Sequence, residues 1–402
     1  MASFLPSLRL NLDILPSPDA SRPGLVLRDP YQYSPATLLI PPLLINGLRL
    51  FDGKQSLRDL QAGFARLAGV TQADAIAASL YGALDRAGFL DNATYREMKA
   101  RREQEFATAP ARNAVFAGSA YPIEKDHLSK LLSLRIGSPA GDSETLAIAA
   151  PHASPDGGWA TYRAAYRSLP SEKMDDRTFV ILGTSHYGAP ERFGLTRKPF
   201  ITPLGKAQTD LRLVDELQRI APKAIAMEDY CHSIEHSIEL QIIFLQYLYG
   251  PEVRILPILC GPFVKSVSQG GLPEDNEELR RFFDALGELA AREGKKLFWI
   301  LGVDMAHMGQ RYGDARPVLA NDDGMLEVKQ RDHQRIEQLA SGDHRSYWNL
   351  IQQKDDDLRW CGSAPFYTFL KAAPNARGTL LHYHQWQIDP QSVVSFAALR
   401  FT

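Results

Sequence analysis

Four runs of apolar residues, separated by helical patterns, dominate the chain beyond residue 112. Each run is apolar at nearly every position rather than at every second one, which is typical of strands that are covered on both faces. The pattern predicts an α/β domain over residues 112–402, with a central, mostly parallel sheet and helices on both faces. The four predicted strands lie within residues 145–153, 178–186, 253–261 and 297–307.

The first 111 residues show a different pattern. Residues 24–30 and 47–55 have the composition of short strands, and apolar residues at helical spacing predict helices over residues 56–69 and 71–91. A charged stretch then gives way to one rich in Ala, Pro and Gly, as expected of a helical arm that runs into a linker. We therefore expect a small α+β domain over residues 1–111.

The composition is that of a globular protein: of 402 residues, 45% are hydrophobic and 23% are charged. A formal net charge of -2 provides no basic surface for nucleic acid or for an anionic membrane. The most apolar early stretch, residues 36–45, is too short to span a bilayer and contains Pro41 and Pro42. With no signal-peptide pattern at the start, we expect a cytoplasmic protein with no nucleic-acid or membrane partner.

Histidines follow three of the four predicted strands. His152, His186 and His307 each come after a short turn, and Asp304 lies three positions before the last of them. Ligands of open α/β sheets bind outside the carboxyl ends of the strands, so these side chains are expected to converge. Two histidines, one anionic ligand and open positions suit Fe(II) or a similar ion. Any one of the histidines could equally be a turn residue that bonds a carbonyl group.

Residues 230–241 repeat the four letters HSIE and also spell H-x-x-E-H, an inverted zinc-peptidase motif. On an α-helix, His232 and His236 would share a face and bind Zn²⁺, while Glu235 would act on a bound water. A zinc peptidase is therefore one alternative, although a five-letter pattern recurs by accident. The other interpretation is a helix beside a metal site, with Glu235, His236 and Glu239 facing the cleft or orienting the ligands.

Six short motifs then occur in the order found in one protein family. They are PHAS (151–154), LGTSHYG (182–188), EHSIELQ (235–241), GVDMAHMGQRY (302–312), WCGSAPFY (360–367) and SVVSFAALRF (392–401). On these motifs, residues 115–402 resemble the Memo family, also described as protein B of the AmmeMemoRadiSam system. The fold of that family is similar to that of the class III extradiol ring-cleavage dioxygenases.

The resemblance implies a metal site made by two histidines and a cysteine. The matching residues are His152, His186 and Cys361, and the implied cofactor is a divalent transition metal. Fe(II) is favoured, with copper or zinc as alternatives, because a thiolate ligand also suits softer ions. Ser154 and Pro155 stand where the family has a glycine and an aromatic residue, a difference that affects the substrate pocket more than the metal.

A set of catalytic residues is implied next to the metal. Asp304 and His307 match the family's pair beside the metal, and His307 stands where the dioxygenases have an acid/base histidine. Glu235 and His236 complete the predicted catalytic set.

Two functions follow from the resemblance, and whether the protein is an enzyme stays open. One is an iron- or copper-dependent oxidoreductase related to the class III extradiol dioxygenases, acting on an unknown small molecule. The other is a non-catalytic adaptor that binds a peptide or phosphopeptide in the same pocket. Residues 1–111 resemble PqqD-like winged-helix domains, which bind leader peptides for radical SAM enzymes. Radical SAM and AMMECR-type proteins are therefore expected partners.

Overall fold

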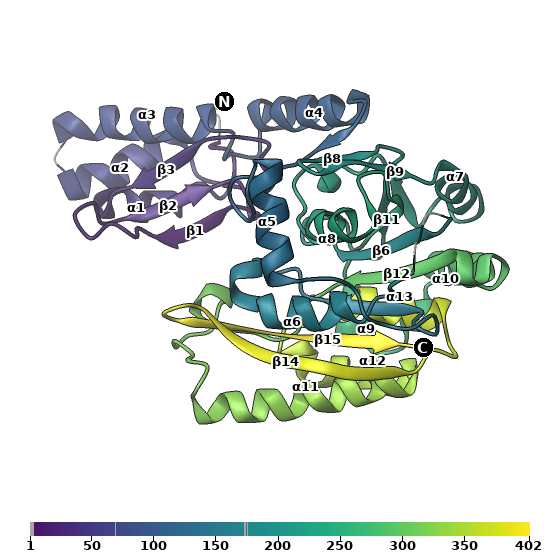
Figure 1. The fold of residues 1–402 in the computed structure, drawn as a ribbon. Coiled ribbons are helices and arrows are strands. Elements are labelled where there is room, and N and C mark those ends of the chain that lie inside the picture. Colours follow the sequence, from purple (N-terminus) through teal and green to yellow (C-terminus); the bar gives the residue numbers. More distant parts are fainter. Residues whose placement is uncertain (1–3, 69, 173, 175) are drawn as a thin grey trace. The chain divides into compact units, whose positions relative to one another are not determined.

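The computed structural model describes residues 4–68, 70–172, 174 and 176–402, and its chain divides into two compact units. These are unit 1, Met1–Thr108, and unit 2, Ala109–Thr402. The predicted boundary after residue 111 lies close to this division. Figure 1 shows the elements of both units.

Unit 1 is an α+β unit with its own hydrophobic core. Its strands pair antiparallel in chain order: β1 (Asp13–Pro16), β2 (Leu25–Arg28) and β3 (Thr37–Ile40). Its helices are α1 (Pro42–Leu48), α2 (Leu57–Ala68), α3 (Val70–Arg86) and α4 (Ala93–Thr108). Buried residues of strands and helices meet in one cluster, which includes Leu27, Ile40, Phe64, Leu84 and Phe89. The winged-helix resemblance of this unit stays a prediction.

One predicted element of unit 1 is wrong. The strand expected over residues 47–55 is absent, because α1 occupies Pro42–Leu48 and a turn and bends follow it. Proline is well suited to the first position of a helix, where its missing N–H would have no partner, so Pro42 starts α1. Residue 69, where one predicted helix ends, lies outside the described residues. Across the described part of the chain, every helix is too short or too polar to cross a membrane.

Unit 2 is built on a large sheet whose centre is parallel, as predicted. The four apolar runs of the sequence form its central strands, which lie side by side in the order β5 (Ala147–Ala150), β12 (Leu297–Gly302), β6 (Thr178–Thr184) and β11 (Arg254–Cys260).

Antiparallel strands border this parallel centre, so the whole sheet is mixed. The strand β15 (Ser392–Phe401) pairs antiparallel with β5, with β13 (His307–Gly309) and with β14 (Gly378–Asp389). Since only two residues separate β14 from β15, the two strands form a hairpin and must run antiparallel. The remaining strands are β4 (Arg112–Asn113), β7 (Phe193–Leu195), β8 (Phe200–Thr202), β9 (Gly205–Thr209) and β10 (Ile225–Met227).

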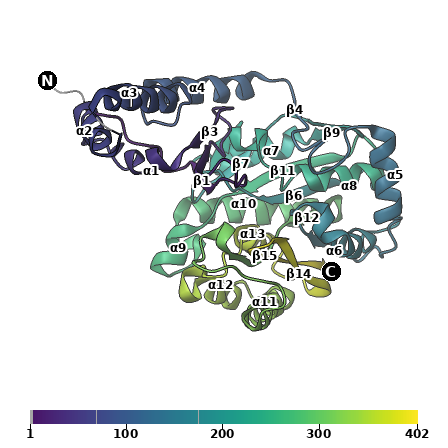
Figure 2. The same cartoon turned by 90° about the vertical axis from the view of Figure 1, so that its left-hand side faces the viewer.

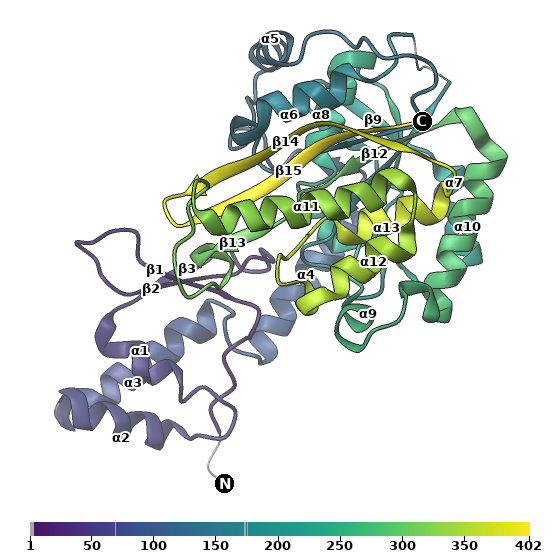
Figure 3. The same cartoon turned by 90° about the horizontal axis from the view of Figure 1, so that it is seen from below.

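Helices cover both faces of this sheet, as Figures 1, 2 and 3 show from three directions. On one face lie α5 (Lys125–Arg135), α6 (Pro155–Arg167) and α8 (Glu239–Tyr249). On the other lie α7 (Leu211–Ile220), α10 (Glu277–Glu293), α11 (Asp323–Ser341), α12 (His344–Gln352) and α13 (Ser363–Ala372), with the short α9 (Val264–Gln269) beside them. Short 3₁₀ turns are η1 (Tyr230–Ser233), η2 (Pro273–Asp275), η3 (Gly294–Lys296), η4 (Gln310–Tyr312) and η5 (Gln353–Asp356).

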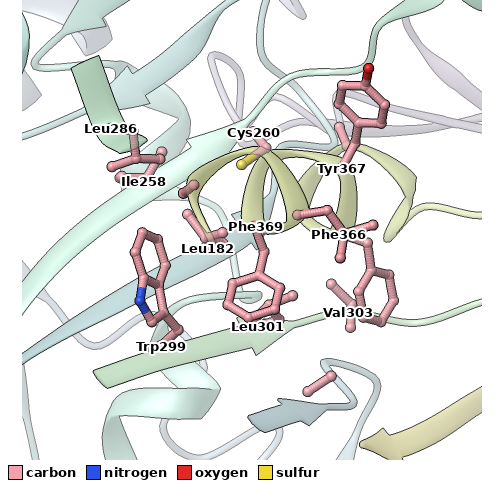
Figure 4. Packing of buried hydrophobic residues seen from close by; sticks show 14 of the residues in the cluster. Leu182, Ile258, Cys260, Leu286, Trp299, Leu301, Val303, Phe366, Tyr367 and Phe369 are labelled. Atoms are coloured by element: carbon pink, nitrogen blue, oxygen red, sulfur yellow. The ribbon is translucent and has the colours of Figure 1, made fainter. Parts of the chain in front are cut away.

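Successive residues of the central strands alternate between the two cores. In β6, Val180 and Leu182 belong to the core on the α13 side, whereas Phe179 and Ile181 belong to the core on the α8 side. Figure 4 shows Leu182 and its neighbours packed against α13. Because both faces are buried, each strand must be apolar at nearly every position, which explains the continuous runs in the sequence.

Candidate metal centre

Three predicted site residues follow the ends of central strands, and a fourth, Cys361, precedes a helix. His152, His186 and Asp304 each lie two residues beyond the end of a central strand, namely β5, β6 and β12. Cys361 directly precedes Gly362, the residue that caps the N-terminus of α13. Since β5, β12 and β6 are parallel neighbours, their carboxyl ends lie together, as expected from the sequence.

His152, His186 and Cys361 form a compact cluster. One ligand atom of each lies within 4.8 Å of those of the other two. Sγ of Cys361 is 3.4 Å from Nε2 of His152. The two imidazole rings are nearly perpendicular, with centroids 5.0 Å apart. The structure thus brings the three predicted ligands together, and their binding of a metal stays a prediction.

Hydrogen bonds decide which nitrogen of each histidine faces the cluster. Nδ1 of His152 donates to the carbonyl oxygen of Gly302 at 2.9 Å. Nδ1 of His186 donates to the carboxylate of Glu235 at 3.0 Å. Both Nδ1 atoms are therefore occupied, which leaves Nε2 of each ring for a metal and holds the ring in a fixed orientation.

Glu235 is a buried carboxylate that organises two histidines. Its oxygens lie 3.0 Å from Nδ1 of His186 and 3.0 Å from Nδ1 of His236. They also accept from the backbone N–H groups of His186, His236 and Ser237 at 3.0, 2.8 and 3.2 Å. Burial by itself raises the pKa of Glu235, but the two imidazoles outweigh it and hold the pKa well below its usual range. These donors occupy the carboxylate, and Glu235 also lies close enough to His186 and His236 to form a second group of potential metal ligands.

His236 supplies a third imidazole at the site. Its ring is stacked on that of His186, with centroids 5.1 Å and planes 11° apart, and it is perpendicular to the ring of His152. The edge of Phe116 covers it at 5.5 Å. Burial lowers the pKa of His236 although Glu235 opposes the shift, so the ring is neutral at pH 7.

The charges of Cys361 and its neighbouring histidines depend on one another. Burial would raise the pKa of the Cys361 thiol, yet His152 and His307 hold it well below its ordinary value. Burial would likewise lower the pKa of His152, but Asp304 and Cys361 raise it to about 9. The pKa of His186 is raised well above its usual value, because Glu235 outweighs the effect of burial. Without a bound cation, these shifts favour the thiolate form of Cys361 and the protonated rings of His152 and His186.

Asp304 and His307 lie beside the cluster, and their catalytic roles stay predictions. Oδ1 of Asp304 accepts the backbone N–H of His152 at 3.0 Å, and Oδ2 is 3.5 Å from Nε2 of that ring. His307 begins β13, and its Nδ1 donates to the carbonyl oxygens of Met305 and Arg359 at 2.8 and 3.1 Å. Nε2 is therefore the nitrogen that His307 can present to the site.

The structure contradicts the zinc-peptidase alternative. Tyr230–Ser233 is the 3₁₀ turn η1, and α8 begins only at Glu239, so the H-x-x-E-H segment has no helical face. His232 is buried, and its Nε2 donates to the carbonyl oxygen of Gly194 at 3.0 Å. Within the described residues, His232 belongs to neither group of potential metal ligands.

Three residues near the site were misjudged or missed from the sequence. Of the two roles expected for Glu239, facing the cleft is wrong, because Glu239 is buried and ion-paired with Arg112. Orienting the ligands stays a prediction. Gln241 was not singled out, yet its Nε2 donates to the carbonyl oxygen of Pro151 at 2.9 Å and so fixes the backbone before His152. The only signal for Gln241 was its place in the EHSIELQ motif. Arg112 had no local signal, because its partner lies far along the chain.

Two glycines let the turn that carries Glu235 approach the sheet. A Cβ atom at Gly302, the last residue of β12, would lie 2.3 Å from the carbonyl oxygen of Ser237. A Cβ atom at Gly183 in β6 would lie 2.6 Å from Oγ of the same serine. This hydroxyl donates to the carbonyl oxygen of Thr184 at 2.8 Å, which ties the turn to the strand end. The absence of side chains at these glycines therefore sets the distance between Glu235 and the strand ends.

A cavity of about 510 Å³ adjoins the cluster, with His186 and Cys361 in its lining. This volume is in the range of small-molecule sites. The arginine in its lining, Arg359, is ion-paired with Asp314. Its apolar lining residues include Pro262, Phe263, Val264, Val267 and Ala364.

Fold and cluster together define an α/β protein with a candidate metal centre of two histidines and one cysteine at the carboxyl edge of its sheet. The family model described as "Memo-like protein" matches residues 112–400. The chain belongs to the Memo family.

Relatives of known sequence support this assignment. A MEMO1 family protein of Aquifex aeolicus is 27% identical over 380 residues, covering 94% of this chain and 95% of that protein. One of Thermococcus kodakarensis is 30% identical over 298 residues, covering 71% of this chain and 97% of that protein. The alignment with the Aquifex protein covers more residues than unit 2 contains. The similarity to this relative therefore extends into unit 1. A solved structure, uncharacterized protein JW3007 of Escherichia coli K12, has a TM-score of 0.33 at 10% identity over 56% of this chain and 86% of that one, too low to support an argument.

We predict that purified protein binds roughly one transition metal ion per chain and that His152→Ala/His186→Ala loses it, because only one of three ligands remains. Elemental analysis after dialysis measures this, with circular dichroism as the check of folding. The matched control is His232→Ala, which should keep its metal because that ring bonds Gly194 instead. Full metal content in the folded double variant would show that the site is elsewhere.

We also predict that the apparent metal affinity rises with pH up to about 9. Below that pH the ring of His152 must lose a proton before Nε2 can bind, because its pKa is raised to about 9, and His186 is shifted in the same direction. Binding at pH 7 should release roughly one to two protons per ion. Calorimetry in two buffers of different ionisation enthalpy counts them. An affinity that stays constant from about pH 6.5, the usual histidine pKa, to pH 9 would contradict the assigned protonation states.

Proposed function

We propose that this Memo-family protein is a metal-dependent oxidoreductase that acts on a small organic molecule. The observation that carries the proposal is the convergence of two imidazole nitrogens and one thiolate beside a cavity of about 510 Å³. His152, His186 and Cys361 would hold the ion, with Fe(II) favoured and copper or zinc as alternatives. An ion with three protein ligands supplies open positions for substrate and, if it is iron or copper, redox chemistry.

The donor set fits such an ion. Each histidine has Nδ1 tied to an acceptor, so Nε2 is directed to the cluster without a change of rotamer. Cys361 already has a strongly lowered pKa and supplies the anionic ligand. Three protein ligands of this kind resemble a two-histidine, one-carboxylate site in which the thiolate replaces the carboxylate.

The remaining residues have distinct tasks in this proposal. Glu235 holds the rings of His186 and His236 through their Nδ1 atoms. Asp304 accepts the backbone N–H of His152 and so positions that ligand. His307, whose Nδ1 is bound to carbonyl oxygens and which lies near Cys361, can take up or deliver a proton at Nε2 to a substrate bound at the metal. The apolar walls of the cavity hold an organic body and exclude water from it.

The alternative of a phosphopeptide-binding adaptor has less support. Recognition of a phosphate group requires unpaired cations or several free N–H donors. Among the described residues of the cavity lining, Arg359 is the one Arg or Lys side chain, and it is paired with Asp314, while His186 is held by the carboxylate of Glu235. The lining also contains the carboxylates of Asp355 and Asp356, the second of which is paired with Arg335. This charge distribution favours a neutral or cationic ligand over a phosphorylated one.

A cytoplasmic location and partnership with radical SAM and AMMECR-type proteins belong to the same proposal. Their support is family membership. The winged-helix character proposed for unit 1 would give such partners a second binding surface.

We predict that protein loaded anaerobically with Fe(II) consumes oxygen when supplied with one of a panel of catechols, and that His307→Gln slows this by roughly 10²–10⁴-fold. The glutamine removes the proton-transfer group but leaves the three ligands in place, so metal content should be unchanged. An oxygen electrode gives the rate and elemental analysis the metal content. The absence of oxygen uptake with every catechol tested, despite stoichiometric iron, would contradict a ring-cleavage activity.

A separate prediction concerns Cys361. Coordination occupies the sulfur lone pair, so Cys361 should resist alkylation in metal-loaded protein and react after chelation. Mass spectrometry of the alkylated peptides measures this, with the buried thiols of Cys231 and Cys260 as internal controls. Cys361→Ala should bind Fe(II) weakly, whereas Cys361→Glu should restore binding through a carboxylate. If chelation leaves the reactivity of Cys361 unchanged and Cys361→Ala keeps its metal, Cys361 is not a ligand.

A further inference from the structure

Arg112 is a buried cation at the start of unit 2, and its guanidinium contacts the segment that carries Glu235. Its side chain is 1% exposed. Nε donates to the carbonyl oxygen of His232 and Nη2 to that of Glu235, each at 2.8 Å. Nη1 donates to the carbonyl oxygen of Asn113 at 3.0 Å and is ion-paired with Glu239. One rigid planar group thus joins β4 to both ends of a non-helical turn.

Glu239 completes the attachment from the first turn of α8. Its carboxylate is fully buried and accepts the backbone N–H groups of Val115 and Phe116 at 3.0 Å each. The hydroxyl of Tyr121 donates to the same carboxylate. A buried ion pair needs such additional hydrogen bonds to offset the cost of desolvation. The result is that residues 112–121 are fastened to residues 232–239.

Residues 232–239 contain Glu235, the residue that orients a proposed ligand. Glu235 itself supplies one of the two carbonyl groups that Arg112 binds, and it lies four residues before Glu239, where α8 begins. Its carboxylate holds Nδ1 of His186. Residues 234–238 form a short connection between η1 and α8, in which the backbone N–H of Glu235 donates to the carbonyl oxygen of Cys231 at 2.9 Å. The position of the Glu235 carboxylate depends on this connection and on the bond from Arg112. A displacement of this backbone would therefore move the ring of His186 directly.

We propose that Arg112, together with Glu239, is a positioning residue of the metal centre that acts through the backbone of Glu235. The proposal rests on the proposed function, because it concerns the same candidate metal centre. The planar fork of arginine matters as well as its charge, since a lysine can keep the ion pair with Glu239 but cannot donate to both carbonyl groups in one plane. Arg112→Lys thus separates geometry from charge.

The test compares Arg112→Lys with Arg9→Lys in the full chain. Arg9 is a matched control: it is also a buried arginine, it pairs with Asp29 through two N–H groups at 3.1 and 2.9 Å, and it donates to the carbonyl oxygen of Gly88, but it lies in unit 1. Two quantities are measured. The first is the affinity for Co²⁺ and its ligand-field spectrum; the second, without added metal, is the ring N–H resonance of His186 that reports its bond to Glu235.

We expect Arg112→Lys to weaken Co²⁺ binding by roughly 10–100-fold and to shift the spectrum, as for other changes in groups that orient metal ligands. The His186 ring N–H should exchange faster with solvent. Arg9→Lys should change neither quantity, even if it lowers the melting temperature as much as Arg112→Lys does. Equal Co²⁺ affinity and an unchanged His186 resonance in folded Arg112→Lys would overturn the proposal.

Failure of the proposed function would be distinguishable from failure of this inference. If wild-type protein binds no metal, the proposed function fails, and the His186 resonance still decides whether Arg112 positions the ring. If Arg112→Lys does not fold, Glu239→Gln takes its place, because the amide keeps one acceptor oxygen but lacks the charge that pairs with Arg112. The same faster exchange of the His186 N–H is expected there, and its absence in the folded variant would overturn the proposal.

Discussion

The parallel register of three neighbouring strands is the constraint on which the candidate metal centre depends. Gly302, the last residue of β12, is paired with Ala150 at the end of β5 and with Gly183 near the end of β6. The chain therefore leaves all three strands at one level, and the residues that follow meet within a few ångströms. Since each strand is buried on both faces, a one-residue shift of register would move every side chain into the opposite core, where the surrounding side chains do not match its size and shape, so packing on both faces fixes this level.

Much of the fold could be predicted because buried parallel strands have a sequence signature of their own. The runs that became β5, β6, β11 and β12 are apolar at nearly every position and only four to seven residues long. The hairpin β14–β15 lacks this signature: β14 is only half-buried, and the pairing is set by the two-residue turn rather than by composition. The error at residues 47–55 arose because apolar residues there suggested a strand, whereas Pro42 had already started a helix.

The candidate site was predictable only as far as its residues follow strand ends or known motifs. His152, His186, Asp304 and Cys361 satisfied one condition or the other. Arg112 satisfied neither, since it is a buried charge whose partners are about 120 residues away in the chain and are mostly backbone carbonyl groups. Sequence patterns show how residues are spaced within one helix or strand. A contact between a side chain and a backbone group far along the chain produces no such pattern, so it cannot be predicted in this way.

The charges of the cluster explain how the proposed ligands can be held in place before a metal ion binds. Without a cation, protons on His152 and His186 offset the charges of Cys361 and Glu235, as the directions of their pKa values indicate. A divalent ion bound by Nε2 of both rings would replace two protons of the same total charge, so the net charge of the cluster would not change. The Nδ1 atoms would keep their bonds to Gly302 and Glu235, because the ion uses the opposite nitrogen of each ring. Loading would then need little rearrangement, and the precision of the site would depend on whatever holds the Gly302 carbonyl group and the Glu235 carboxylate in place.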